Sequence, residues 1–189
     1  MDDRRLSVVV RQATPADADG IARLHYLSHT TSFRPFAPAA WVASRDFEEY
    51  RRKWLERLGT SSESQASWVA LEGRDIVGTA SANWFPRDLS EGERRFAAIR
   101  AVHVHPQRMG LGIGRQLWDC ARSFLQANRC ARAGVDTILA NTRARRFFEA
   151  AGFRLVSIAP CGVEGVPIAI YERDLEAADS AGPDLRPAE

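Results

Sequence analysis

Three glycines on alternate positions, Gly110, Gly112 and Gly114, are the residues whose spacing most clearly indicates chemistry. The stretch before them, residues 99–104, is apolar and β-branched enough for a buried strand, which Pro106 ends because proline has no N–H for a sheet ladder. After them, apolar side chains recur at helical spacing. Glycines at such a junction let backbone N–H groups approach an anion, and the helix N-terminus adds partial positive charge. The pattern predicts a phosphate-binding turn.

Two common classes of glycine-rich phosphate turn fit this stretch poorly. A nucleotide-triphosphatase loop needs a lysine directly after its last glycine, and Lys53 is the only lysine of the chain. A dinucleotide-binding turn needs its third glycine three residues after the second. Here Gly114 comes one residue early, although Asp136 stands near the distance expected for the ribose-binding acid. The first class is excluded, and the second is a weak match.

Two motifs at the expected separation resemble the Gcn5-related N-acetyltransferase (GNAT) family. In the first, residues 104–106 read Val-His-Pro and precede the glycine turn, with Met109 where the family usually has Gln or Arg. The second, at residues 141–153, reads Asn-Thr-Arg-Ala-Arg-Arg-Phe-Phe-Glu-Ala-Ala-Gly-Phe and resembles the family's Asn-x-x-Ala-x-x-x-Tyr-Glu-x-x-Gly-Phe. The resemblance extends from about Val8 to Leu175 and implies acetyl-coenzyme A (acetyl-CoA) as co-substrate.

The resemblance and the sequence pattern together predict a single α/β domain at residues 1–175. In the GNAT fold a mixed, mostly antiparallel sheet carries helices on both faces, and two adjacent parallel strands splay apart to admit the pantetheine arm. Here those strands would end near Val104 and begin near Ala133. Residues 176–189, rich in Ala, Asp and Pro, are expected to form an unstructured tail. The other predicted elements are strands at Ser7–Arg11, Ser67–Leu71, Asp75–Trp84, Phe153–Ile158 and Pro167–Arg173, and helices at about Pro15–His29, at about Arg45–Leu58, and from about Ile113 and Asn141.

The resemblance implies that main-chain groups hold most of the cofactor. Backbone N–H groups of the glycine turn would bind the pyrophosphate, with Arg115 either as a supplementary cation or as a solvated helix residue. Asn141 would hydrogen-bond the pantetheine, or instead cap the helix that it begins. One of the three arginines within residues 143–146 would reach the adenosine 3′-phosphate. The predicted cofactor-binding residues are Val102, His103, Val104, Met109, Gly110, Leu111, Gly112, Ile113, Gly114, Arg115, Asn141 and Phe148.

The sequence departs from the family where an acid and a base are expected. Phe148 replaces the tyrosine that protonates the leaving thiolate in the family, and phenylalanine carries no proton. Tyr171 is predicted as a substitute acid, with a buried core tyrosine as the alternative. Ala98 stands where many relatives carry a glutamate base. His103 is predicted as the base because imidazole titrates at about pH 6.5, with a structural histidine as the alternative.

Composition limits the classes of partner. The net charge of +2 over 189 residues gives no general attraction to nucleic acid or membranes. No stretch has the roughly 18 apolar residues of a membrane span. The three cysteines lack metal-ligand spacing, so no metal site is predicted, and the absence of an apolar signal segment predicts a cytoplasmic protein. A homodimer is left open.

These observations predict an acetyl-CoA-dependent N-acetyltransferase in which an amine attacks the thioester directly. The amine would belong to a small molecule, an amino acid or a peptide, and would have a low pKa because no dedicated base is evident. Phe33, Trp41 and Trp84 flank or lie in the loops expected to cover this amine. The alternative function is a catalytically silent acyl-CoA-binding sensor or interaction module, because the acid and base positions have both changed.

Overall fold

The computed structural model describes residues 7–60, 62–85, 95–163 and 166–175. Seven strands form one sheet in the order β1-β2-β3-β4-β5-β7-β6. All neighbouring strands pair antiparallel except β4 and β5, which are parallel. The prediction of a mixed, mostly antiparallel α/β sheet is confirmed. The strands are β1 (Val8–Gln12), β2 (Gln65–Glu72), β3 (Asp75–Trp84), β4 (Arg95–Val104), β5 (Cys130–Ile138), β6 (Arg154–Val163) and β7 (Val166–Asp174).

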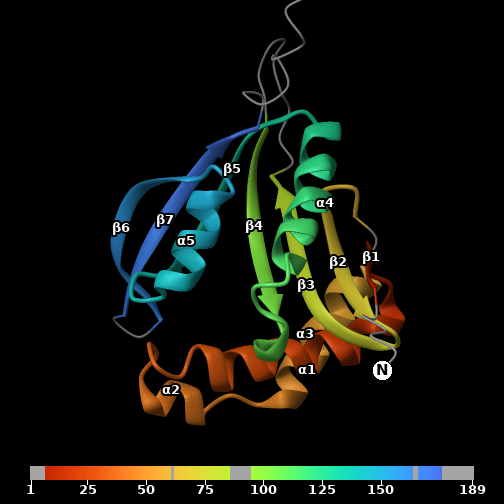
Figure 1. Cartoon of the computed structure of the whole chain (residues 1–189), viewed down its shortest axis with the longest axis vertical. Coiled ribbons are helices and arrows are strands. Elements are labelled where there is room, and N and C mark those ends of the chain that lie inside the picture. The colour runs from red at the N-terminus through yellow and green to blue at the C-terminus, as the bar shows by residue number, and fades with distance from the viewer. Residues whose placement is uncertain (1–6, 61, 86–94, 164–165, 176–189) are drawn as a thin grey trace, which may run out of the picture.

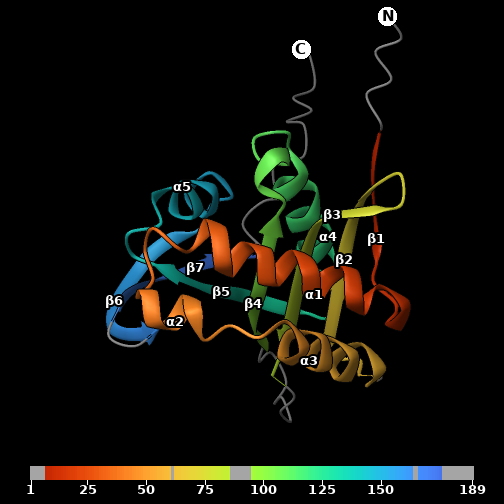
Figure 2. The same cartoon turned by 90° about the horizontal axis from the view of Figure 1, so that it is seen from below.

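Helices cover both faces of the sheet (Figures 1 and 2). On one face lie α4 (Ile113–Ala127) and α5 (Thr142–Ala150). Toward the other face, and across one end of the strands, lie α1 (Ala18–Leu27), α2 (Ala39–Ala43) and α3 (Phe47–Gly59). β4 therefore has a different set of helices on each side.

An apolar stripe anchors α4 to the sheet. Its buried residues recur at helical spacing, so one face of the helix packs onto the strands beneath it. A fully buried side chain of this size contributes about 1.5–3 kcal/mol. The stripe thereby fixes the N-terminus of α4 next to the glycine turn. The buried residues of α4 are Ile113, Leu117, Trp118, Ala121 and Leu125.

The parallel pair β4 and β5 is joined at one end only. Residues 95–98 of β4 pair with residues 130–134 of β5. Beyond them β4 continues to Val104 and β5 to Ile138 without pairing to each other. Figure 1 shows β4 and β7, the next strand after β5, fanning apart in this direction. The predicted splay of the two parallel strands is therefore present.

The first long helix gives way to a π-helical turn before its predicted end at His29. α1 ends at Leu27, and the π-helical turn η2 (Ser28–Ser32) follows. The hydroxyls of Thr30 and Thr31 donate to backbone carbonyls one turn earlier, which competes with regular helical bonding. π-turns occur frequently at functional sites.

Two predicted segments lie outside the described residues: most of the charged loop after Phe85 and the tail at residues 176–189. Within the described part of the chain, no helix is both long and apolar enough to cross a membrane.

Candidate functional site

The glycine turn joins β4 to α4 through left-handed backbone. Gly110 has a φ of +85° and Gly112 a φ of +80°, a conformation that residues with side chains rarely adopt. A Cβ atom on either glycine would meet nothing within 4 Å beyond its chain neighbours, so open space lies beside both. Gly112 is also the N-cap of α4 and offers no side chain to the first helical N–H groups. The turn therefore provides both donors and space for an anion such as a phosphate.

Gly114 differs from the two glycines before it. A Cβ there would lie 3.2 Å from the ring of Phe147, so this glycine lets α4 approach α5 closely. Arg143 Nη1 lies 3.1 Å from Met109 Sδ, which places the first turn of α5 beside the glycine turn. Arg143 is thus positioned to reach a ligand there, whereas the Arg145 guanidinium is engaged inside the fold.

Two residues predicted to touch the cofactor have partners within the protein. Arg115 Nε lies 3.2 Å from Asp119 Oδ1 in an exposed ion pair one helical turn apart, which is typical of a solvated helix face. Asn141 Oδ1 accepts a hydrogen bond of 3.1 Å from the backbone N–H of Ala144 and so caps α5. The cofactor contacts of both residues stay predictions.

β4 has an unpaired main-chain edge in the stretch predicted to hold pantetheine. Its residues 101–104 pair with β3 on one side, but they have no partner in β5 on the other. The side chains of Val102 and Val104 pack against the core, so they do not occupy that edge. A ligand amide could use the edge as an added strand would.

The aromatic residues predicted near the thiol belong to the core beneath α5. Phe148 is buried, with its ring centroid 5.7 Å from that of Phe153. Tyr171, on β7, is fully buried, and its hydroxyl donates to Glu149 Oε1 at 2.8 Å and accepts from Arg145 Nε at 2.9 Å. This arrangement matches the alternative of a core tyrosine with a satisfied hydroxyl. It does not favour Tyr171 as the acid.

His103 points from β4 toward α1 and η2. Its Nδ1 lies 3.0 Å from Ser28 Oγ, and its ring centroid lies 4.2 Å from that of His25. His103 is 7% exposed, and this burial lowers the pKa of its imidazole to about 3. The ring is therefore uncharged at neutral pH, with a lone pair on one nitrogen.

Two histidines that sequence reasoning missed lie beside His103. The Nε2 atoms of His25 and His29 are 3.3 Å apart. One ring nitrogen from each of the three histidines lies within 4.8 Å of the others, and we call this set the histidine cluster. From α3, Trp54 Nε1 donates to His25 Nδ1 at 3.1 Å, and Tyr50 Oη lies 2.6 Å from His29 Nδ1. The i,i+4 spacing of the first two was a usable signal, but their approach to His103 is a tertiary contact.

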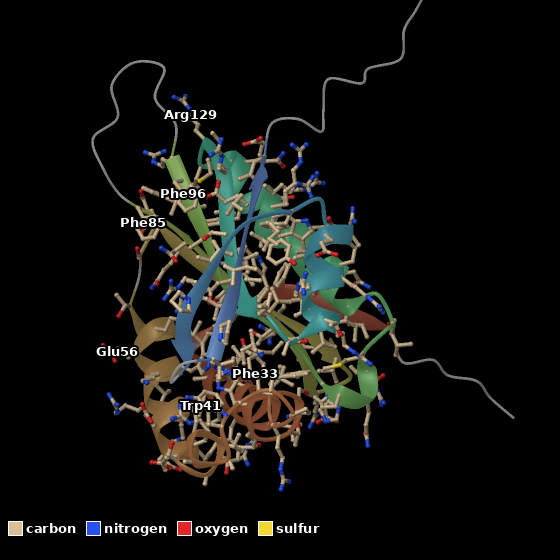
Figure 3. The ribbon with its side chains drawn as sticks, turned by 90° about the vertical axis from the view of Figure 1, so that its left-hand side faces the viewer. Phe33, Trp41, Glu56, Phe85, Phe96 and Arg129 are labelled. Carbon is tan, nitrogen blue, oxygen red and sulfur yellow. The ribbon has the colours of Figure 1, made fainter. Side chains whose placement is uncertain are left out.

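Phe33 and Trp41 close around the histidine cluster, whereas Trp84 does not. The ring centroid of His29 lies 4.7 Å from that of Phe33 and 5.2 Å from that of Trp41. Figure 3 shows these two aromatic residues together at one end of the molecule. Trp84 lies at the opposite end of β4, where the Arg95 guanidinium is 4.2 Å from its ring. Two of the three aromatic residues expected near the acceptor thus gather at one place.

A groove between the start of α1 and the β2–β3 hairpin lies apart from these features. Two ion pairs lie in its lining: Arg11 with Asp17, and Arg108 with Glu72. The groove includes neither the glycine turn nor the histidine cluster.

Comparison with known proteins identifies the family. The model of the acetyltransferase (GNAT) family matches residues 27–153. This chain belongs to the GNAT acetyltransferase family. A search of curated proteins found no match to this chain.

Solved structures share the GNAT fold with this chain. A putative GNAT acetyltransferase from Desulfovibrio desulfuricans is 21% identical, with a TM-score of 0.65 over 89% of this chain and 99% of that chain. PaiA N-acetyltransferase from Thermoplasma acidophilum, solved with coenzyme A, is 14% identical, with a TM-score of 0.71 over 89% and 99%. Arabidopsis thaliana NAA60, solved with acetyl-CoA, is 16% identical, with a TM-score of 0.64 over 89% and 98%. At these low identities, the TM-scores show a common fold and no more.

Family membership confirms two predictions made from the sequence. The resemblance to GNAT proteins is correct, and acetyl-CoA is the co-substrate that the family and its solved members indicate. The residues of this chain fit that ligand, because the left-handed glycine turn leaves open space at the N-terminus of α4.

Proposed function

We propose that this protein is an acetyl-CoA-dependent N-acetyltransferase that acts on an amine of a small molecule, an amino acid or a peptide. The observation that carries the proposal is that β4 holds His103, a buried and uncharged imidazole, and leads directly into the open glycine turn. The turn would hold the pyrophosphate, and the unpaired edge of β4 would hold the pantetheine. Acetyl-CoA supplies the thioester that the amine attacks.

His103 would accept the proton that the attacking amine loses. Its low pKa keeps a lone pair free at neutral pH but makes the imidazole a weak base. A weak base suits an amine of which a substantial fraction is already deprotonated near neutral pH. An α-amino group has a pKa of about 7.7–8.0, compared with about 10.4 for a lysine side chain, and a gap of roughly 2.5 units corresponds to about 3.5 kcal/mol. The proposed acceptor is therefore a low-pKa amine, with Phe33 and Trp41 as its neighbours.

The second candidate function is a catalytically silent acyl-CoA-binding module. It is favoured by the region beneath α5, where Phe148 has no proton to donate and the Tyr171 hydroxyl is held between Arg145 and Glu149. Transfer would then require the leaving thiolate to take its proton from water. A free thiol has a pKa of about 8.5, so a thiolate can leave near neutral pH without a dedicated acid.

Thiol release from acetyl-CoA across matched amines tests the proposal. Alanine amide offers only an α-amine, and Nα-acetyl-lysine amide offers only an ε-amine. We expect turnover on α-amines at pH 7.5 to exceed that on the ε-amine by at least about tenfold, because more of the α-amine is deprotonated. Thermal shift with acetyl-CoA provides the binding control. Stabilisation by acetyl-CoA without turnover on any amine would favour the silent module, and faster turnover of the ε-amine would refute the low-pKa acceptor.

A further inference from the structure

The histidine cluster has the spacing of a metal site. Zinc binds histidine nitrogens at about 2.0–2.1 Å in tetrahedral geometry, so two of its ligand atoms lie about 3.3 Å apart. The Nε2 atoms of His25 and His29 are separated by 3.3 Å, and His103 supplies a third nitrogen within 4.8 Å. Burial lowers the pKa of all three imidazoles, which removes the competing proton. The distances and the protonation state of the rings alone would therefore allow a metal ion.

The hydrogen bond from Trp54 changes this interpretation. An indole N–H can only donate, so His25 Nδ1 must be the acceptor and must carry no proton. A neutral His25 then carries its proton on Nε2, which points at His29 Nε2. Binding a metal through that atom would need the proton to move to Nδ1, where it would face the indole N–H. His25 is thus held in the tautomer that cannot bind a metal at the centre of the cluster.

The same constraint passes from His25 to His29 and Tyr50. Because His25 Nε2–H donates to His29 Nε2, the proton of a neutral His29 lies on Nδ1. His29 Nδ1–H then donates to Tyr50 Oη, 2.6 Å away. The result is one directed chain, from the indole of Trp54 through two imidazoles to a phenol.

The charged groups around the chain also oppose a cation. Burial is the largest cause of the lowered pKa of His25 and of His29. The positive charges of Lys53 and Arg57 on α3 lower the pKa of His25 further, and that of Arg45, between α2 and α3, lowers the pKa of His29. Adding a proton to either ring would also replace an accepted hydrogen bond with a contact between two protons.

We propose that Trp54 is a positioning residue whose indole N–H locks the tautomers of His25 and His29 and keeps the histidine cluster free of metal. His29 then serves as a fixed neutral donor to Tyr50, and His103 is left as the imidazole whose tautomer the chain does not dictate. This inference is independent of the proposed acyl transfer, because neither of its tests measures turnover.

Direct observation of the histidine tautomers is the first test. Long-range ¹H–¹⁵N spectra of the wild-type protein at pH 7.5 distinguish protonated from unprotonated ring nitrogens. We expect an unprotonated Nδ1 in His25 and an unprotonated Nε2 in His29. A proton on His25 Nδ1 would overturn the proposal, and this test requires no variant that could fail to fold.

Zinc binding by an indole-deleted variant is the second test. Trp54→Phe keeps an aromatic ring but removes the N–H, so His25 becomes free to carry its proton on Nδ1. We expect calorimetry with ZnCl₂ to show binding at least about tenfold tighter than in the wild type, and His25→Ala added to this variant to abolish the gain. Trp118→Phe is the matched control, because the Trp118 indole N–H has no hydrogen-bond partner among the described residues. This variant should bind Zn²⁺ no more tightly than the wild type.

The zinc results also have defined contrary outcomes. Wild-type protein that binds Zn²⁺ as tightly as Trp54→Phe would show that the indole does not exclude metal. A folded Trp54→Phe variant that binds Zn²⁺ as weakly as the wild type would also show that the indole does not exclude metal. A gain that survives His25→Ala would place the metal outside the histidine cluster. Each of these results would overturn the proposal.

Discussion

The glycine turn and the histidine cluster flank the same strand, β4, but they are built from different parts of the chain. The turn is a continuous segment that uses backbone N–H groups, and its left-handed glycines lie two residues apart. The cluster uses side chains from α1, η2 and β4, with hydrogen bonds from α3, so its members are separated by up to 78 residues, from His25 to His103. The turn has open space beside it for an anion, whereas His103 is buried, His25 and His29 are half-buried, and the cluster's hydrogen bonds are made within the protein.

We propose that this difference follows from what each region binds, pyrophosphate at the turn and the acceptor amine beside the cluster. A pyrophosphate is the same in every reaction of an acetyltransferase family, so backbone donors that are independent of side-chain identity suffice. An acceptor amine varies, and side chains from several elements can be exchanged to suit it. On this view the turn should be sensitive to backbone changes and the cluster to changes in side-chain chemistry.

The largest expected effect is at the glycine turn. Gly112→Val places a β-branched residue at a φ of +80°, and strain of this kind amounts to about 1–3 kcal/mol. We expect acetyl-CoA affinity to fall at least about 100-fold by calorimetry, because the side chain or the altered backbone occupies the space for the pyrophosphate.

A matched control separates strain from binding. Gly73 lies in the β2–β3 turn with a φ of +64°, and a Cβ there would also meet nothing within 4 Å. Gly73→Val should destabilise the fold to a similar extent while leaving acetyl-CoA affinity unchanged. Unchanged affinity in Gly112→Val would show that the phosphate site is elsewhere.

Lowering the pH should destabilise the fold through the histidine cluster. The pKa of His29 is lowered to about 4 and that of His103 to about 3, mainly by burial. Between about pH 6.5 and these values the unfolded chain binds protons that the folded chain does not. Stability is therefore fully present above about pH 6.5 and falls below it, by up to about 1.4 kcal/mol per pH unit for each histidine.

Urea titrations between pH 4.5 and 8 would measure this slope. The variant His103→Gln should show a shallower decline than the wild type. Asp17, whose pKa is lowered to about 2 chiefly by its hydrogen bonds with Arg11, loses its contribution only below about pH 3.8, outside the measured range. A flat profile in the wild type would contradict the burial of neutral imidazoles.

A smaller effect is expected when the predicted base is removed. His103→Ala should lower kcat/KM for an α-amine by about tenfold, less than the roughly 100-fold at the lower end for general bases, because a substantial fraction of the amine is already deprotonated. The measurement is a pH profile of kcat/KM, in which activity should rise toward the pKa of the acceptor amine itself. Unchanged kcat/KM in His103→Ala would remove His103 from the mechanism and leave the structural alternative.

The smallest effect distinguishes the two roles of Asn141. Its side chain caps α5, so Asn141→Ala should lower stability by about 1 kcal/mol. Asn141→Asp retains a capping oxygen and should keep most of that stability, but it lacks the amide N–H groups. A weaker acetyl-CoA affinity in Asn141→Asp, measured by calorimetry, would support the pantetheine contact, and an unchanged affinity would leave only the cap.

The sequence by itself determined the parts that depend on local backbone conformation. The positions of Gly110 and Gly112 predicted the turn, because left-handed backbone favours glycine wherever it occurs. Periodic apolar residues predicted α4, and alternation and turn residues predicted the strands, although β5 and β6 are longer than expected. The same local patterns, together with the Asn141 motif, were sufficient to indicate the family.

Only the tertiary structure decided which side chains meet. Gly114 was grouped with the other glycines, but its space is filled by Phe147 from α5, a contact that depends on how two helices pack. Tyr171 was a candidate acid until packing placed its hydroxyl between two side chains of α5. The link from Trp54 to His25 and on to His103 depends on α1 lying between α3 and β4, and no sequence spacing encodes that distance. Local propensity sets the conformation of a segment, whereas contacts between segments are fixed by burial of their apolar faces over the whole fold.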